Sequence, residues 1–409
     1  MFPQKYEAKI NKGKITITKQ EITTENIEEN HPILKALTRE KIEKNKYKPR
    51  KWVQKFYQTR EKWKNTLTIL QKHKLYTKPN YIPDATKKLK KWGAYKTTLY
   101  QIATTLLQRK VPKRSEKYEA AEADLNWLAA IIAEKEPKFT HICQRGNCIK
   151  NPKLPLQIHT KEMALLLGII SGDGSFYKVK DREREKLVLA IISTRKEFLN
   201  WAHSIIEKIF GKVKPSIYKV SKRKLQYRYY TAYITEAIRL AGMKLGRKPE
   251  HLEVPQWIKE KKEYIANWFK GELESDGNLK INPEKKDIQL RYTRNIVQEI
   301  KKETIKKLLN KAKILKRTNQ YMINATQLPE KPPKPKIIKD EEEMIQKLTG
   351  KKPKTRIEKI FYNIKTEKIT VEWVVTLYGK HAIQMIEKTK PPRIWKKHQK
   401  NKHKITWIK

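Results

Sequence analysis

Two amphipathic segments share one pattern of apolar and polar positions. Residues 159–177 are HTKEMALLLGIISGDGSFY, and residues 261–281 are KKEYIANWFKGELESDGNLKI. Apolar residues recur at helical spacing in both segments, and each segment then has a small residue followed by Asp and Gly. The pattern predicts two helices, each ending at an Asp-Gly step, and the two steps lie 103 residues apart.

The pattern that follows each helix also repeats. After the first helix we expect these elements in order: strands at 175–179 and 187–193, a helix at 196–210, strands near 213–218 and 226–234, and a helix to about 245. After the second we expect strands at 278–282 and 287–293, a helix from 296 to about 313, strands around 360–364 and 368–377, and a helix at about 380–388. The order αββαββα therefore occurs twice, which predicts an α+β fold made of two pseudo-symmetric units.

The remaining sequence sets the domain boundaries. We expect four regions: a basic and mainly helical N-terminal region at 1–155, a first repeat unit at 156–255, a second at 256–390 and a basic tail at 391–409. The clearest N-terminal helix is predicted at 118–133, with acidic residues in its first turn. Within the second unit, residues 328–356 are rich in Pro and Lys around a short acidic helix, and we interpret them as an insertion between strands.

The charge of the chain points to a polyanionic partner. Its 409 residues carry 94 Lys and Arg against 43 Asp and Glu, which gives a net charge of +51. Cations set on phosphates release condensed counterions, so nucleic acid is the expected partner, and the tail lysines Lys396 and Lys397 are expected to bind it or to remain loose. Hydrophobic residues make up 38%, which is enough for a globular fold. The low Cys and Gly content and the abundant Lys and Ile are typical of a thermophile.

Several classes of protein are excluded by composition. The longest apolar runs, 165–170 and 187–192, are far shorter than a membrane span. The N-terminus lacks a secretory signal pattern, so we expect a cytoplasmic protein. Only Cys143 and Cys148 are present, which excludes a disulfide framework. The termini also lack the reactive residues of a complete intein.

Small residues predict close packing of the two repeated helices. Gly168 and Gly172 lie on one helical face, and Gly271 and Ser275 repeat that spacing in the second helix. If the helices pack on these faces, their C-terminal ends bring Asp173 together with Asp276, and Gly174 and Gly277 then lead into the first strands.

Two carboxylates at the negative ends of two helix dipoles are electrostatically unfavourable. A divalent cation relieves that repulsion, and hard carboxylate oxygens suit Mg²⁺ or a similar ion such as Mn²⁺. Asp173 and Asp276 are therefore candidate metal ligands.

At these residues the chain resembles a known family. The stretches LLGIISGDG (166–174) and FKGELESDG (269–277) are similar to the nine-residue signature of the LAGLIDADG homing endonucleases, in the single-chain form with two copies. The resemblance covers about residues 160–390. It implies a site-specific double-strand DNA endonuclease, intron-encoded or free-standing, that works as a monomer on a long recognition site and leaves 3′ overhangs.

The resemblance also assigns roles to residues. It makes Asp173 and Asp276 the catalytic metal ligands and the four small residues the helix interface. Two four-stranded sheets would form a saddle over the major groove, with alternate strand residues facing DNA, and an auxiliary polar or basic residue would end the second strand of each unit. The expected DNA-facing residues are Lys178, Lys180, Arg291 and Thr293, and the auxiliary candidates are Thr194, Arg195 and Arg294. Ser171, Lys270 and Glu272 depart from the family pattern.

Other interpretations remain open at this stage. The Asp-Gly steps could be purely structural helix caps, or the fold could have lost catalysis and serve as an intron RNA maturase, a DNA-binding regulator or a ribosome-associated protein. His141, Cys143, Cys148 and His159 could bind zinc, although their spacing is not that of a familiar finger. Residues 143–148 could instead form a simple loop with buried or disulfide-paired thiols. Residues 93–110 could form a DNA-reading helix or an ordinary amphipathic one.

Overall fold

The computed structural model describes residues 4–11, 14–21, 65, 66, 69, 76–81, 138–144, 147–181, 184–244, 246, 252–300, 302–309, 312–315 and 320–405. The chain forms two compact units. One consists of Met1–Lys62 with Tyr81–Lys138, and the other of Trp63–Asn80 with Phe139–Lys409. The predicted helix at 118–133 and the stretch 93–110 lie outside the described residues.

The described parts of the first 155 residues are mostly strands, whereas the sequence pattern predicted a mainly helical region. Strands β1 (Gln4–Asn11) and β2 (Lys14–Glu21) form an antiparallel hairpin. A separate three-stranded sheet has the order β3 (Tyr76–Tyr81), β4 (Lys138–Gln144) and β5 (Asn147–Lys150). Most of the predicted helical region lies outside the described residues, so its mainly helical character stays a prediction.

The first repeat unit has the predicted order of elements. In chain order they are α6 (Lys161–Gly172), β6 (Gly174–Asp181), β7 (Arg184–Ser193), α7 (Lys196–Phe210), β8 (Ser216–Ser221), β9 (Lys224–Tyr229) and α8 (Ala232–Leu240). Helix α6 begins where the Thr160 side chain accepts a hydrogen bond from the Met163 amide. The four strands form an antiparallel sheet in the order β6-β7-β9-β8.

The second unit repeats this plan with additions. Its elements are α10 (Gln256–Glu260), α11 (Lys262–Ser275), β10 (Asn278–Asn282), β11 (Asp287–Val297), α12 (Lys302–Leu308), β12 (Lys313–Leu315), β13 (Gln320–Asn324), η2 (Ala325–Gln327), α13 (Lys336–Thr349), β14 (Lys354–Asn363), β15 (Ile369–Tyr378) and α14 (Gly379–Thr389). Its antiparallel sheet has six strands in the order β10-β11-β15-β14-β13-β12. The strands β13 and β12 thus extend the sheet at the edge farthest from β10.

The structure moves the boundaries of the predicted insertion. Helix α13 directly precedes β14 as α7 precedes β8, packs against α11 and α14, and buries Ile338, Met344 and Ile345. It therefore belongs to the core of the second unit, although residues 328–356 were interpreted as an insertion. The predicted helix at 296–313 is replaced by the end of β11, by α12 and by β12, because β11 continues its alternation as far as Val297.

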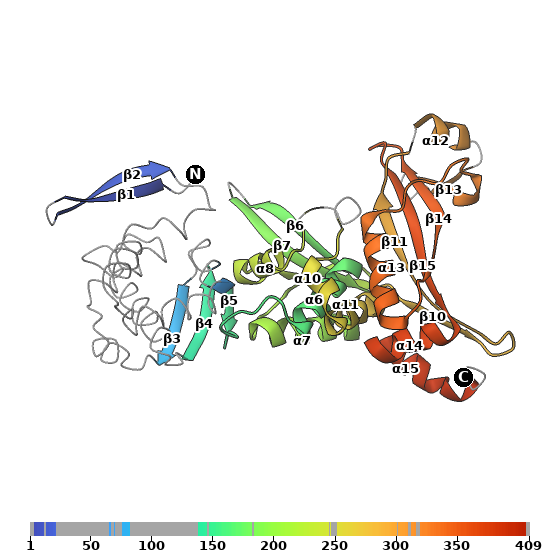
Figure 1. The fold of residues 1–409 in the computed structure, drawn as a ribbon, viewed down its shortest axis with the longest axis horizontal. Coiled ribbons are helices and arrows are strands. Elements are labelled where there is room, and N and C mark those ends of the chain that lie inside the picture. The colour runs from blue at the N-terminus through green and yellow to red at the C-terminus, as the bar shows by residue number, and fades with distance from the viewer. Residues whose placement is uncertain are drawn as a thin grey trace, which may run out of the picture. The chain divides into compact units, whose positions relative to one another are not determined.

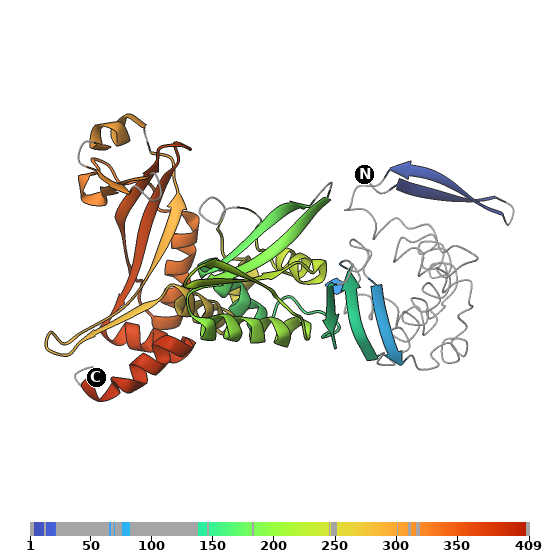
Figure 2. The same ribbon diagram turned by 180° about the vertical axis from the view of Figure 1, so that it is seen from behind.

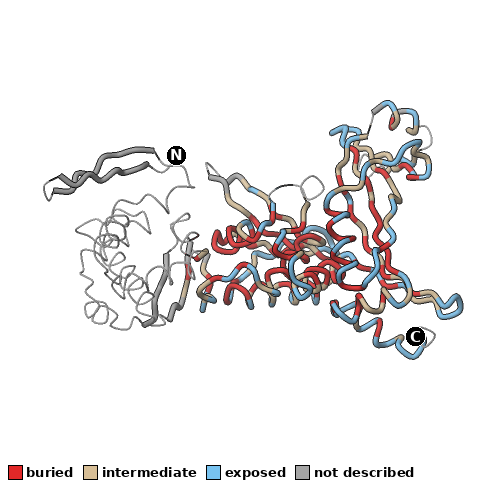
Figure 3. The backbone as a smooth tube through the Cα atoms, viewed as in Figure 1, coloured by how far each residue is buried: buried red, intermediate tan, exposed pale blue. Residues whose placement is uncertain are grey.

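The helices α6 and α11 pack side by side at the centre of the larger unit, with the two sheets on either side of them (Figures 1 and 2). The buried residues concentrate in this helix pair and along the sheet faces that the helices cover (Figure 3). The predicted α+β fold with two related units and two antiparallel sheets is confirmed.

The basic tail continues the fold. Helix α15 (Pro392–Lys400) and the short η3 (Lys402–Lys404) follow α14, and α15 contacts α11, α14 and β10. Ile394 and His398, four residues apart on one helical face, are buried there. Among the described helices, none has the length and apolar character needed to cross a membrane.

Candidate active site

The two signature helices meet backbone to backbone. A Cβ atom added at Gly168 would lie 2.1 Å from the carbonyl oxygen of Trp268, and one at Gly271 would lie 2.4 Å from that of Leu165. At Gly172 the added atom would lie 2.4 Å from the Ser275 Cβ. The small residues are therefore at the closest approach of α6 and α11, and no larger side chain fits without moving a helix.

Both aspartates lie where these helices end. The amide of Asp173 donates to the Ile169 carbonyl, and the amide of Asp276 donates to that of Glu272 at 2.9 Å. Asp173 is half-buried and Asp276 is exposed. The Asp276 Oδ2 is 3.3 Å from the Cβ position at Gly172, one residue before Asp173. The two aspartates thus lie at the adjoining ends of the two packed helices.

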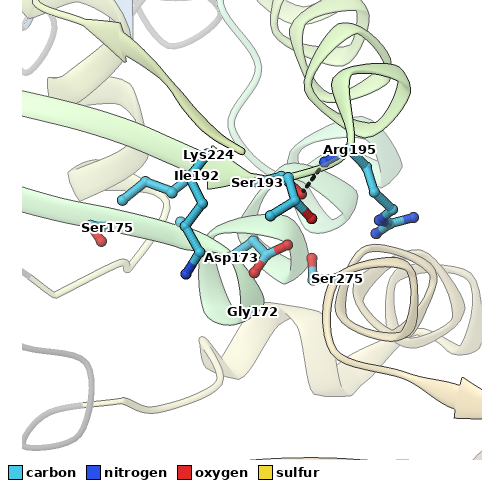
Figure 4. A pocket seen from close by; sticks show the side chains of 10 residues that line it. Gly172, Asp173, Ser175, Ile192, Ser193, Arg195, Lys224 and Ser275 are labelled. Atoms are coloured by element: carbon cyan, nitrogen blue, oxygen red, sulfur yellow. Dashed lines mark hydrogen bonds between the residues drawn. The ribbon is translucent and has the colours of Figure 1, made fainter. Parts of the chain in front are cut away.

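A shallow hollow of about 440 Å³ opens beside these ends. Figure 4 shows side-chain oxygens of Asp173, Ser193 and Ser275 around it, with Arg195 to one side. The hollow is lined by Gly172, Asp173, Gly174, Ser175, Ile192, Ser193, Thr194, Arg195, Lys224 and Ser275. Its lining is mostly polar and includes the cations Arg195 and Lys224, so an anionic ligand such as a phosphate would be accepted there.

The auxiliary candidates of the first unit lie at this hollow. Thr194 is exposed on its wall. Arg195 forms an ion pair with Glu274 of the other unit, with Nη1 2.7 Å from Oε1, and its Nη2 donates to the Glu274 backbone carbonyl at 2.5 Å. Its guanidinium also lies 4.9 Å from the centre of the Phe198 ring. Arg195 therefore joins the two units beside the acids.

The auxiliary candidate of the second unit is placed differently. Arg294 is 3% exposed and is not among the residues that line the hollow. Its guanidinium forms ion pairs with Glu272, at 2.9 Å, and with Glu341 of α13, and it donates to the Ser171 carbonyl at 3.2 Å. The alternation of β11 turns Arg294 toward the helices, and a role for it beside Asp276 stays a prediction.

Burial and charge explain the titration behaviour of this cluster. Tyr292 donates to Glu341 at 3.0 Å. Burial and the neighbouring Glu341 raise the pKa of Tyr292 well above its usual value. Burial lowers the pKa of Arg294, but attraction to Glu272 and Glu341 outweighs it and the net pKa is raised. The two departures from the family pattern in α11 are thus accommodated: Glu272 is buried against Arg294, and Lys270 is half-buried with its pKa lowered, chiefly by desolvation.

A third cation near the acids comes from α15, which sequence reasoning treated as a tail. The Arg393 amide donates to Glu274 Oε2 at 2.6 Å, and its Nη2 donates to the Gly277 carbonyl. Desolvation and repulsion from Arg195 lower the pKa of Arg393, while Glu274, Asp173 and Asp276 act in the opposite direction. The sequence signals for this helix were Pro392 at its first position and the pair Ile394 and His398, which lie four residues apart among cations.

The open faces of the sheets carry some of the predicted contact residues. In β11 the residues Arg291 and Thr293 alternate with buried ones and lie on the face away from the helices, where Arg291 forms an ion pair with Glu358 at 3.2 Å. In β6 the register places Lys178, which is exposed, on the same side as the buried Phe176, and its contact with DNA stays a prediction. The side chain of Lys180 lies outside the described residues.

The open face of the first sheet has residues that the sequence reasoning missed. Arg228 lies over the Tyr218 ring at 4.1 Å, and the Tyr218 and Tyr230 hydroxyls are 3.1 Å apart. Strand alternation on β9, from the buried Tyr227 to Arg228, was the signal that could have found them. In α15, Lys396 is exposed, and Lys397 Nζ donates to the Leu279 carbonyl at 2.6 Å.

The proposed zinc ligands do not assemble. Cys148 is disulfide-bonded and lies opposite Cys143, the only other cysteine, in the β4–β5 register. His159 stacks on Trp257 with ring centres 4.8 Å apart. Among the described residues no group of three or more His, Cys, Asp and Glu side chains is placed to hold a metal.

The donors at the helix ends fit a hard divalent cation. Asp173 lines the polar hollow and Asp276 lies at the adjoining helix end, and both offer carboxylate oxygens. Mg²⁺ is commonly held by one or two carboxylates, with waters and substrate phosphates completing its octahedral shell. Two acids are therefore enough to hold such an ion.

Comparison with solved structures finds distant similarities. A mesophilic variant of the homing endonuclease I-DmoI is 14% identical, with a TM-score of 0.32 over 57% of this chain and 97% of that one. The homing endonuclease I-GzeII in complex with its DNA target is 11% identical, with a TM-score of 0.31 over 62% and 93%. Full-length WhiA from Thermatoga maritima is 11% identical, with a TM-score of 0.33 over 63% of each chain. No protein-family model and no curated protein matches the sequence.

Proposed function

We propose that the chain is a divalent-metal-dependent endonuclease that cuts both strands of a specific double-stranded DNA site, working as a monomer. The observation that supports this most strongly is the convergence of Asp173 and Asp276 at the ends of two helices packed backbone to backbone. Two acids related by an internal repeat suit a substrate with two related scissile strands.

The chain's own residues supply the charge arrangement. Asp173 and Asp276 would hold the metal, which when bound lowers the pKa of a coordinated water and stabilises the leaving oxygen. The helix dipoles make the acid pair a strong cation site because each carboxylate lies at a negative helix end. Arg195 and Lys224 line the adjacent hollow and would orient the phosphate.

The sheets would supply register and specificity. Arg228, Tyr218 and Tyr230 on the first sheet, with Arg291 and Thr293 on the second, lie on the sheet faces that the helices leave open. Phosphate contacts from such residues would position the protein, and contacts to base edges would select the site.

A non-cleaving nucleic-acid binder on the same fold, such as an intron RNA maturase or a regulator, is the second candidate. It is favoured by the position of Arg393, whose charge interacts with both aspartates. In that case the acids would be members of an ion network that holds the two units together.

A cleavage assay on a randomised duplex library separates the two. With Mg²⁺ or Mn²⁺ we expect breaks with 3′ overhangs at a shared long site. Asp173→Asn and Asp276→Asn should each lower cleavage at least 100-fold while binding stays within about threefold, as expected for loss of a metal ligand. Glu284→Gln, in the exposed turn between β10 and β11, is the matched control. Specific binding without breaks would instead support the second candidate, and RNA would then be tested as ligand.

A further inference from the structure

Helix α15 delivers a cation to the proposed cleavage site from outside the repeat. The helix is fixed by Ile394, which is 1% exposed and packs so closely that a Cβ at Gly277 would lie 2.7 Å from its Cδ1. Gly277 is the residue after Asp276. Arg393 precedes Ile394, so its position is set relative to the acid by a buried apolar contact.

The backbone and side chain of Arg393 are both anchored. Its amide donates to Glu274 Oε2, and its Nη2 donates to the Gly277 carbonyl. The first contact fixes the backbone of Arg393 to Glu274, two residues before Asp276, and the second holds its guanidinium against the carbonyl of Gly277, the residue after Asp276. Glu274 also holds Arg195, so one buried carboxylate sets the positions of two cations that come from different parts of the sequence.

The guanidinium retains capacity for an anion. Arg393 is exposed, and among the described residues its side-chain hydrogen bond uses Nη2. A guanidinium has five N–H donors in a planar fork, so Nε and Nη1 can still serve phosphate oxygens. Arg294, the cation expected beside Asp276, is buried in its own ion pairs. Arg393 fills that place.

We propose that Arg393 is a phosphate-binding residue of the second half-site, holding the backbone of the strand cut beside Asp276. This rests on the proposed endonuclease function. Helix α15 then connects the packing of the C-terminal segment to cleavage. When the Arg393 charge is removed, the two DNA strands are cut at unequal rates.

The test compares Arg393→Met and Arg393→Lys with Lys400→Met in single-turnover cleavage of the target identified above. Lys400 is an exposed lysine on the same helix, seven residues away, which is roughly 10 Å along the axis. We expect Arg393→Met to lower the rate of cutting one strand at least 30-fold and the other strand less than threefold, so that nicked DNA accumulates. Arg393→Lys should recover part of the rate, and Lys400→Met should cut both strands normally.

A structural role would give a different result. The Ile394→Ala substitution loosens α15. The thermal midpoint of this variant should therefore fall, and it should cut both DNA strands more slowly. If Arg393→Met lowers the thermal midpoint as much as Ile394→Ala, or slows both strands equally, the phosphate-binding role is wrong.

Binding to duplex DNA provides a readout that does not need cleavage. The logarithm of the DNA-binding constant falls linearly with the logarithm of the salt concentration. Losing one phosphate contact should make this slope less steep by about 0.9 in Arg393→Met and leave it unchanged in Lys400→Met. If the wild-type chain binds but never cuts, the endonuclease function fails while this slope still tests Arg393. An unchanged slope in Arg393→Met would overturn the inference in either case.

Discussion

The two repeat units build the same helix ends with different chemistry. The strand registers match Ser193 of β7 with Arg294 of β11, and the helices match Ile169 with Glu272. In the first unit these places hold a hydroxyl and an apolar side chain. In the second they hold a fully buried ion pair that Glu341 of α13 completes.

A shared contact survives this divergence. Arg195 donates to the Glu274 carbonyl, and Arg294 donates to the Ser171 carbonyl, at matching positions of the two signatures. Each unit thus caps the other unit's signature helix with a guanidinium, although the two arginines come from places that differ by two residues along the strand. The repeat preserves the backbone contact, and the side chains that support it are free to change. Matched positions in the two units should therefore respond unequally to substitution.

The largest inequality is expected at Arg294. Arg294→Met leaves Glu272 and Glu341 buried without their cation, which typically costs about 3–5 kcal/mol. Ser193→Ala at the matched position should cost less than about 1 kcal/mol. Chemical denaturation of the two variants measures the difference. Equal losses would show that the cluster does not carry the second unit's stability.

Close helix packing should make the glycines next in importance. Gly168→Ala places a methyl group against the Trp268 carbonyl, so overpacking of about 1–3 kcal/mol is expected, with no side chain able to relieve it. At Gly172 the obstacle is the Ser275 side chain. Exchanging the pair, as Gly172→Ser with Ser275→Gly, should restore the stability that Gly172→Ser alone loses. Failure of this rescue would mean that the two helix ends are not interchangeable.

The sequence predicted most of this architecture but not its supporting contacts. The Asp-Gly steps, the small residues and α7 follow from local patterns, because helix periodicity and caps are properties of neighbouring residues. The burial of Glu341 could not be predicted, since an acid is buried only when a partner such as Arg294, 47 residues away, comes to meet it. For the same reason the acidic α13 was interpreted as peripheral.

Helix α15 was missed because its buried face is so narrow. Ile394 and His398 alone carry it among cations, and a basic amphipathic turn is easily interpreted as a solvated tail. In contrast, the predicted strand contacts depend on the phase of the alternation, because a shift of one residue in β6 reverses the face on which Lys178 lies.

The unequal sheets should give an asymmetric footprint on DNA. Strands β13 and β12 add about two strand spacings, or ~10 Å, to the second sheet. Hydroxyl-radical footprinting should therefore show protection extending roughly three base pairs further on that side of the cleavage site, given 3.4 Å per step. Lys313→Glu, on exposed β12, should shorten only the longer side and weaken binding a few-fold. A symmetric footprint would exclude the added strands from DNA contact.

The smallest predicted effect concerns pH and again distinguishes the units, because α15 packs on the second signature helix. His398 is 2% exposed and stacks on Trp395, and burial lowers its pKa below the usual 6.5, with Lys402 lowering it further and Glu387 opposing. The unfolded chain binds a proton below pH 6.5 more readily than the folded one. The stability that neutral His398 contributes is therefore present above pH 6.5 and is lost as pH falls through its folded pKa, at no more than about 1.4 kcal/mol per pH unit.

Hydrogen exchange of the α15 amides should quicken between pH 7.5 and 5.5, after correction for intrinsic rates, while α6 amides stay constant. His398→Phe should remove this dependence and His403→Gln, an exposed control, should keep it; a dependence that persists in His398→Phe would assign the titration to another group.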